Sequence, residues 1–200
     1  MVDSLLVTFA TIAAALFVTE LTDKDAFLLL TLAAKTRAAV VFLAGATAFV
    51  ITTTVFVTVG TLISAAFPIL WVRLAGGAVM IGYGLWEARG VDSRGDAEKE
   101  ERSMERRFGG WMTFFTIVAG VALLDMAGDA TEVLTIVLAA RYSNPILVFS
   151  AASTGLVSAA AFEAALGNRL GRMLTPHRVR YVSMIVFLVL GTFIIISSLP

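Results

Sequence analysis

Two short acidic segments stand out because each lies within a long apolar stretch of the chain. The first segment, ELTDKD, contains Glu20, Asp23 and Asp25, with Thr22 and Lys24 between them. Carboxylate and hydroxyl oxygens are hard ligands that suit Ca²⁺, Mg²⁺ and Mn²⁺. Ionisable residues inside an apolar segment are costly and most often serve a function. The segment therefore predicts half of a cation site.

The second segment, DMAGDATE, contains Asp125, Asp129 and Glu132, with Thr131 beside them. Met126 would add a soft sulfur ligand and favour Mn²⁺ if it faced an ion; packing against a neighbouring helix is the alternative. The lysine of the first segment is the only basic residue at this depth, so ion pairs explain a minority of the six carboxylates. Closely spaced acids also suit proton binding when a cation leaves, because like charges resist joint ionisation.

The elements that carry these segments have the composition of membrane spans. Of the 200 residues, 58% are hydrophobic and 15% are charged, and the mean hydropathy is +0.90. Soluble domains have about 45–50% apolar and about 25% charged residues. We expect an all-α polytopic membrane protein without disulfides or thiol chemistry, because the chain has no cysteine. Its apolar stretches are each long enough to cross a bilayer and cover residues 4–34, 38–63, 69–88, 110–140, 145–166 and 181–198.

The first and fourth stretches are each about thirty residues long, so we expect a tilt or a local break in them. Each acidic segment lies near the middle of its stretch. On continuous helices, Glu20, Asp23 and Lys24 would share one face, as residues at i, i+3 and i+4 do. The carboxylates of the second segment would share another, and two such faces could enclose a cation.

An internal repeat relates the two halves of the chain. A shift of 106 residues places TDKDAFLLLTLAAK on GDATEVLTIVLAAR, with Asp23 on Asp129. Each half has three spans, so the halves must lie in opposite orientations. Transporters built from such inverted repeats bind their substrate near the middle of the membrane, where the repeats meet. We expect a first repeat over residues 1–88, a charged linker over 89–109 and a second repeat over 110–200.

Basic residues set the expected orientation. Lysine and arginine are concentrated in the loops after the first, third and fifth spans, which places these loops in the cytoplasm and both termini outside. Glu163 then lies near the cytoplasmic end of the fifth span, where we expect it to cap the helix or snorkel; a part in the ion's exit path is the alternative. Hydroxyl groups that could complete the site, with ordinary helix packing as the alternative, are those of Thr52, Thr53, Ser153 and Ser158.

These motifs resemble the Gdt-type cation/proton exchangers of the LysE-like superfamily, which carry E-x-G-D-[KR]-[ST] in the first helix of each half. Glu20, Asp23 and Lys24 match the first copy, in which Thr22 and Asp25 depart from the pattern. In the second copy Gly128, Asp129 and Thr131 match, Met126 replaces the glutamate and Ala130 the basic residue. Asp125 and Glu132 are the candidates to supply the missing carboxylate. The chain is similar to a divergent member.

The resemblance implies a secondary transporter, not an enzyme, that exchanges Mn²⁺ or Ca²⁺ for protons in the plasma membrane of a prokaryote. Its partners would be the lipid bilayer, the metal ion and protons, without nucleic acid or a prosthetic group; a homo-oligomer is left open. We expect the metal ligands to be Glu20, Asp23, Asp125, Asp129 and Glu132. Proton-coupling or secondary roles fall to Asp25, Lys24, Thr22, Thr131 and Met126.

Two other functions fit part of the pattern. A LysE-like exporter of another metal or of a small organic cation would use the same repeat and the same acids. An intramembrane aspartyl protease would use two membrane aspartates to activate water. The protease is disfavoured because the sequence lacks the glycine two residues before the GD pair and has no PAL motif.

Overall fold

The computed structural model describes residues 2–21, 23–88, 111–126, 130–142 and 144–170, and short pieces at 184–185, 188–189, 191–192 and 195–196. All regular elements in these ranges are helices, which confirms the expected all-α class for this part of the chain. The linker at 89–109 and most of the expected sixth span lie outside the described residues. The helices are α1 (Val2–Glu20), α2 (Lys24–Lys35), α3 (Ala38–Ala66), α4 (Ile69–Ala88), α6 (Trp111–Asp125), α7 (Ala130–Arg141) and α8 (Pro145–Leu170).

Proline residues explain two of the helix boundaries. Phe67, which precedes Pro68, is extended with φ −127° and ψ 148°, and α3 therefore ends one residue before it. The residue before a proline is driven out of the helical region by the proline ring. At the start of α8, Pro145 occupies the first helical position, where its missing N–H costs nothing. The Asn144 side chain caps this helix by accepting a hydrogen bond from the N–H of Leu147 at 3.0 Å.

The long first and fourth spans are both broken, and each break lies in an acidic segment. Helix α1 ends at Glu20 and α2 begins at Lys24, with a bend of 67° between the two helices. In the second half, α6 ends at Asp125 and α7 begins at Ala130. The expectation of a tilt or break is therefore confirmed as a break. The expectation of shared helical faces is wrong, because no continuous helix runs through either acidic segment.

The lengths and composition of the helices fit membrane crossing. Two helices of the described part, Ala38–Ala66 and Pro145–Gly167, are long and apolar enough to cross a membrane alone. The bent pair α1–α2 makes a third span if it is counted as one. Shorter apolar helices occupy Leu70–Gly82 and Met112–Asp125. The chain is an integral membrane protein by these features.

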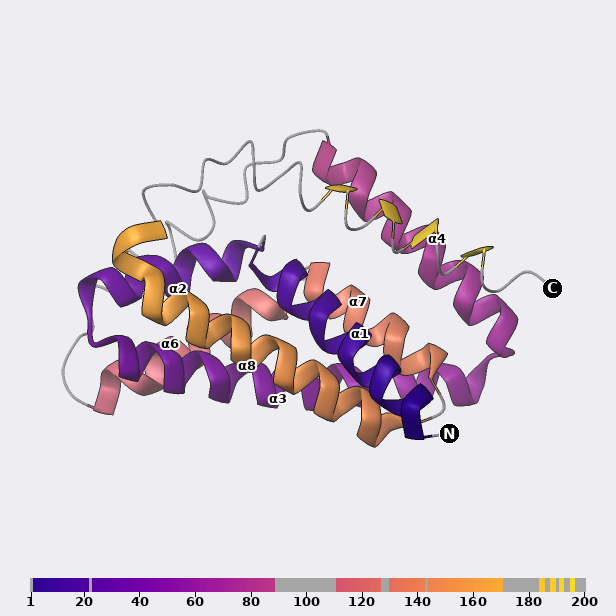
Figure 1. Ribbon diagram of the computed structural model, residues 1–200, viewed down its shortest axis with the longest axis horizontal. Coiled ribbons are helices and arrows are strands. Elements are labelled where there is room, and N and C mark those ends of the chain that lie inside the picture. Colours follow the sequence, from indigo (N-terminus) through magenta and orange to yellow (C-terminus); the bar gives the residue numbers. More distant parts are fainter. Residues whose placement is uncertain are drawn as a thin grey trace.

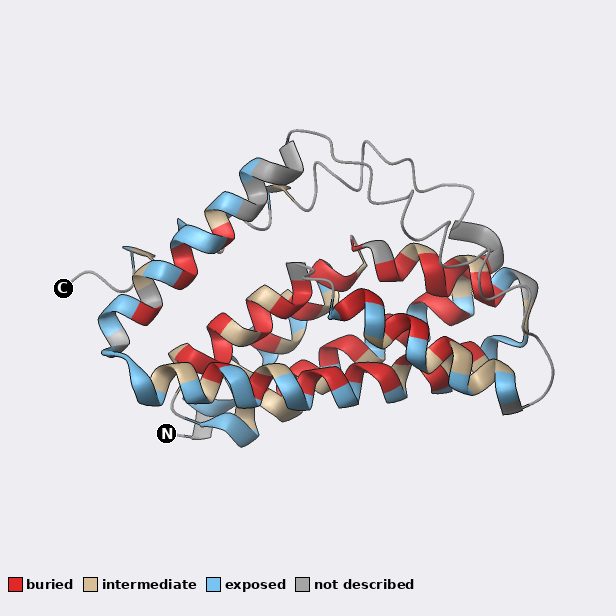
Figure 2. Cartoon of the chain, turned by 180° about the vertical axis from the view of Figure 1, so that it is seen from behind, coloured by how far each residue is buried: buried red, intermediate tan, exposed pale blue. Residues whose placement is uncertain are grey.

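The helices other than α4 form an elongated bundle, while α4 starts at one end and runs back over one side of it at an angle (Figure 1). Buried residues gather on the helix faces that point into the bundle, and exposed residues dominate α4 (Figure 2). The described C-terminal pieces lie along α4 (Figure 1). A close approach joins them, because a Cβ built on Gly77 would lie 3.0 Å from the carbonyl oxygen of Gly191.

The two halves interlock at glycines on their long helices. A Cβ built on Gly60 of α3 would lie 2.4 Å from the carbonyl oxygen of Ile136 on α7. A Cβ on Gly167 of α8 would lie 2.7 Å from the carbonyl oxygen of Leu30 on α2. Glycine alone leaves room for backbones to come this close, as in other membrane helix pairs.

These two crossings correspond residue by residue. Around Gly60 the next contacts are Ala139 and Ala140, and around Gly167 they are Ala33 and Ala34. The alanine pairs are related by the same shift of 106 residues that aligns the acidic segments. Each half therefore places its short second helix, α2 or α7, against the long helix of the other half. In the core of the bundle, α2 and α7 therefore occupy equivalent places in opposite halves.

We predict that Gly60→Ala destabilises the chain, because the new methyl group would collide with the backbone of α7 and not with a movable side chain. Overpacking of this kind costs about 1–3 kcal/mol, which thermal unfolding of the detergent-solubilised protein would detect. The control is Gly82→Ala on α4, where a Cβ would meet nothing within 4 Å. Equal melting temperatures for the two variants would contradict the close crossing.

Candidate cation site

Asp23 joins the two broken spans. It stands directly before α2, the position where aspartate commonly caps a helix. Its Oδ2 nevertheless accepts hydrogen bonds from α7 in the other half: from the Thr131 hydroxyl at 3.1 Å and from the Thr131 backbone N–H at 3.4 Å. Both residues are buried. The start of a helix carries unbonded N–H groups and a partial positive charge, so a carboxylate there is favourable.

Glu20 and Asp125 occupy equivalent places at the ends of the first half-helices. Glu20 is the last residue of α1, and Asp125 is the last residue of α6. Both are buried. The last turn of a helix has unbonded carbonyl groups and a partial negative charge. Carboxylates and carbonyl oxygens therefore gather at each break, and ion-binding transporters use such unwound helix ends to coordinate cations.

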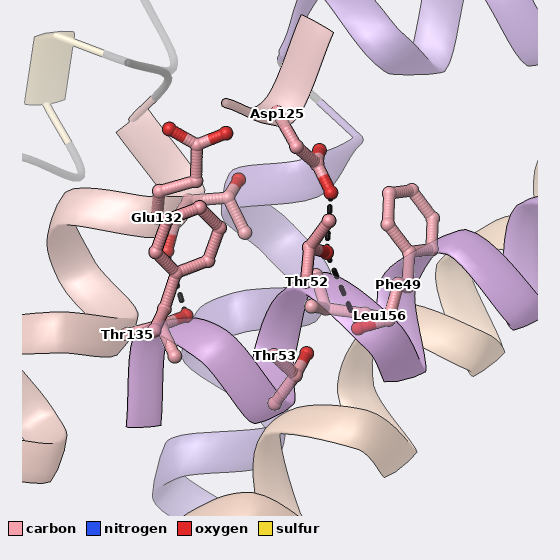
Figure 3. Close-up of a pocket in the computed structure, with 9 residues that line it drawn as sticks. Phe49, Thr52, Thr53, Asp125, Glu132, Thr135 and Leu156 are labelled. Atoms are coloured by element: carbon pink, nitrogen blue, oxygen red, sulfur yellow. Dashed lines mark hydrogen bonds between the residues drawn. The ribbon is translucent and has the colours of Figure 1, made fainter. Parts of the chain in front are cut away.

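A small cavity of about 10 Å³ lies beside the second break. Asp125 extends into it from the end of α6, Glu132 lines it from α7, and Thr52 lines it from α3 (Figure 3). A space of this size is about the least that admits one water molecule. The full lining is Phe49, Thr52, Thr53, Phe56, Asp125, Thr131, Glu132, Thr135 and Leu156.

Two hydroxyl-bearing residues of α3 line this cavity. The Thr52 hydroxyl donates a hydrogen bond to Oδ2 of Asp125 at 2.5 Å, drawn as a dashed line in Figure 3. The neighbouring Thr53 is buried, and its hydroxyl oxygen has no hydrogen-bond partner among the described residues. A buried hydroxyl without a partner is costly. Thr53 is therefore available to a ligand, and an ion or a water in the cavity would supply the missing contact.

The structure brings together some of the predicted site residues but not all. Glu132, Asp125 and Thr131 line one cavity, and Asp23 reaches Thr131 from the first half. Met126 is 62% exposed and does not line the cavity.

Asp25 does not line this cavity, and three other predicted residues lie wholly or partly outside the described part of the chain. Asp25 is buried in the first turn of α2. Thr22 and Asp129 lie outside the described residues, as does the side chain of Lys24. In the part of the chain that is described, no three acidic or histidine side chains lie close enough to hold one metal ion.

Among the four hydroxyl candidates, Thr52 and Thr53 line the cavity, whereas Ser153 and Ser158 do not. Ser158 is exposed and donates its hydrogen bond to the carbonyl of Thr154 on its own helix. Thr135 was missed from the sequence although it lines the cavity. Its position one turn after Thr131 is the signal that would have indicated it, because residues at i and i+4 share a face of α7.

The interpretation of Glu163 as a capping or snorkelling residue is wrong. Its side chain is 1% exposed, so the carboxyl group does not reach the surface of the bundle. Glu163 lies in α8 and does not line the cavity beside Asp125. Its position in the sequence is close to the end of a span, but the side chain lies on a buried face of the helix.

The chain was compared with known protein families, curated proteins and solved structures. The family model described as the divalent cation/proton antiporter GDT1 matches twice, over residues 8–93 and over residues 113–200. The chain belongs to this family. The search of the curated proteins and the search of the solved structures gave no match. The two matched segments each contain one acidic break.

Membership fits the architecture and gives the chain a general activity. GDT1-family proteins are membrane transporters, and divalent cation/proton antiport is the activity that the family implies. The helical spans suit a protein that lies in the lipid bilayer, and the buried acids suit one that binds an ion and protons. The suspected resemblance to Gdt-type exchangers is thereby confirmed.

We predict that Thr131→Val weakens the junction between the two breaks, because Asp23 would lose the shorter of the two hydrogen bonds that it accepts from Thr131. The loss of a hydrogen bond to a carboxylate should cost about 1–2 kcal/mol, measured by thermal unfolding in detergent. Thr131→Ser keeps the hydroxyl and should retain most of the stability. The control is Thr58→Val, because that exposed hydroxyl bonds only to its own helix. A Thr131→Val protein as stable as the control would contradict the junction.

Proposed function

We propose that the chain is a secondary transporter that exchanges a divalent cation, Mn²⁺ or Ca²⁺, for protons through a carboxylate site in the middle of the membrane. The observation that carries the proposal is the contact between Asp23 and the start of α7. It joins two acidic segments far apart in the sequence at the points where both spans are interrupted. Transporters with broken helices bind ions at such junctions.

We assign the cation to oxygen ligands from both segments: Glu20, Asp23, Asp125, Asp129 and Glu132. Asp125 serves as the counterpart of Glu20, because each is the final residue of its half-helix and both are buried. Met126, which aligns with Glu20 by sequence, is exposed. Secondary roles in proton coupling or in positioning remain with Asp25, Lys24, Thr22 and Thr131.

The size and chemistry of the cavity favour an inorganic cation over a small organic one. Its volume of about 10 Å³ suits a single dehydrated ion or a water molecule. The polar lining consists of carboxylates and hydroxyls, which are hard oxygen ligands for Ca²⁺ and Mn²⁺. Without a sulfur ligand from Met126, the described lining gives no soft contact that would separate Mn²⁺ from Ca²⁺.

The same acids suit an exchange cycle. Ionised carboxylates gathered in an apolar span repel one another, and a divalent cation relieves that repulsion. When the cation leaves, protons restore the balance of charge. Alternating exposure then requires the two halves to rock against each other, as six spans arranged in two inverted repeats would allow. The matched alanine contacts at Gly60 and Gly167 support this arrangement. The basic loops would face the cytoplasm.

Transport in liposomes tests the proposal. We expect purified protein to take up Mn²⁺ or Ca²⁺ when a pH gradient is imposed with the acidic side inside, and to release protons in return. An ion-sensitive dye and a pH-sensitive dye would follow the two fluxes in the same vesicles. A proton flux that depends on the divalent ion supports exchange. If neither ion moves, or if cations move without protons, the proposed function is wrong.

We predict that Glu20→Gln and Asp129→Asn each reduce exchange by about 10–100-fold, the usual cost of disturbing a metal site. The amides keep the size of the side chains but remove the charge that holds the cation. The matched control is Met126→Leu, which should transport like the unmodified chain because Met126 is exposed. Unchanged transport in both acidic variants would remove the assignment of the site.

A further inference from the structure

We propose that Glu163 binds the proton that is exchanged for the cation, at a place separate from the cavity beside Asp125. This inference rests on the proposed function, to which it adds a proton-binding carboxyl on a long helix of the second half. Glu163 belongs to neither acidic segment. It lies in α8, well after the second segment.

The first observation is burial without a hydrogen bond. Glu163 is 1% exposed, and neither of its carboxylate oxygens has a hydrogen-bond partner among the described residues. An ionised carboxylate in such surroundings is very unfavourable, and the protonated acid is far less so. The observed arrangement therefore fits a neutral carboxylic acid that already carries its proton.

The second observation is the position of Glu163 on α8. Ala160, three residues before it, lies within contact of a Cβ built on Gly45 of α3, and Leu29 of α2 lies against the same point. Gly167, four residues after Glu163, touches the backbone of α2 at Leu30. Residues at these spacings share a helix face. Glu163 therefore lies on the face of α8 that packs against α2 and α3.

The charged groups on the helices that pack against α8 are mostly acidic. Helix α8 packs against α1, α2, α3 and α7, and α3 has no charged residue. Two basic groups are described near these helices: Arg37 stands directly before α3, and Arg141 lies at the far end of α7 over the ring of Tyr142. The side chains of Lys24 and Lys35 lie outside the described part of α2. The described charged side chains on the four helices are Glu20, Asp25, Glu132 and Arg141.

The relation between the halves gives this position a meaning. Gly60 and Gly167 make equivalent crossings. They are 107 residues apart, one more than the shift between the acidic segments, and this offset of 107 places Glu163 on Phe56 of α3. Phe56 lines the cavity beside Asp125. By this correspondence, Glu163 takes the position on α8 that Phe56 takes on α3, which for Glu163 is on the side of the first break. A carboxyl group there belongs to the ion pathway and not to the lipid-facing surface.

The proton step involves only an O–H bond. As the cation enters between the two breaks, its positive charge stabilises the Glu163 carboxylate, so the carboxyl group gives its proton to water on the side to which the protons are delivered. When the cation has left, the carboxylate takes a proton from water on the opposite side. The number of protons on Glu163 then changes by one in each cycle, and cation and proton occupancy alternate because each disfavours the other.

The test separates proton coupling from cation transport. Glu163→Gln is the neutral analogue of the protonated acid and should keep Mn²⁺/Mn²⁺ self-exchange, which needs no net proton movement. Exchange driven by a pH gradient should fall by about tenfold or more. Glu163→Asp keeps a titratable group and should retain coupled exchange with an altered pH profile. Wild-type gradient-driven exchange in Glu163→Gln would overturn the inference, and so would an equal loss of both activities.

A second variant covers the case in which Glu163→Gln does not fold. Glu163→Met fills a similar volume without needing a hydrogen-bond partner, and the same two fluxes decide. Infrared spectra of the protein provide a readout besides transport, because the unmodified chain should show a protonated carboxyl band that both variants lack. An unchanged band in the variants would count against a proton on Glu163. If the unmodified chain exchanges no cation for protons, the proposed function itself fails; if it does and Glu163→Gln behaves the same, only this inference fails.

Discussion

The hydrogen bonds from Thr131 to Asp23 are the constraint on which the rest of the site depends. A helix that begins inside a membrane protein leaves its first N–H groups unbonded, and no water is present in the hydrocarbon to satisfy them. Helix α7 meets this requirement by donating hydrogen bonds to the carboxylate of Asp23, which belongs to the other half of the chain. Breaking the first span thus supplies the cap for the second broken span, and the two breaks must lie at the same depth.

This shared depth explains the exchange of short helices between the halves. If α7 is to meet Asp23, it must lie against elements of the first half, and the crossing of α3 at Gly60 provides the room. The equivalent crossing at Gly167 holds α2 against α8. The glycines and the acidic breaks therefore act together: the former set how near the helices come, and the latter set where they begin and end.

The sequence predicted the spans better than the site. Hydropathy and Pro68 located α3 and α4 within a few residues, because burial in lipid requires long apolar runs. The length of the first span indicated a break, but nothing in the local sequence predicted the direction in which the chain continues after the break. Asp125 could not be identified as the partner of Glu20 from alignment alone, because the end of α6 turns Met126 outward. Glu163 was misread because depth along a span says nothing about which face of the helix is buried.

The contrast between the two kinds of buried acid shows why the chain suits exchange better than simple conduction. Glu20 and Asp125 stand at helix ends, where backbone carbonyls can join them in holding a cation. Glu163 stands within an uninterrupted helix, and its oxygen atoms have no hydrogen-bond partner among the described residues, so a proton is the ligand that needs no further oxygen atoms. A pore lined by permanently charged carboxylates would attract cations from both sides at once. In the proposed cycle, the carboxyl groups at the breaks are neutralised by a metal ion and Glu163 is neutralised by a proton. The protein that holds neither of them, or both at once, is then unfavourable. That condition is what ties the movement of one ion to the movement of the other.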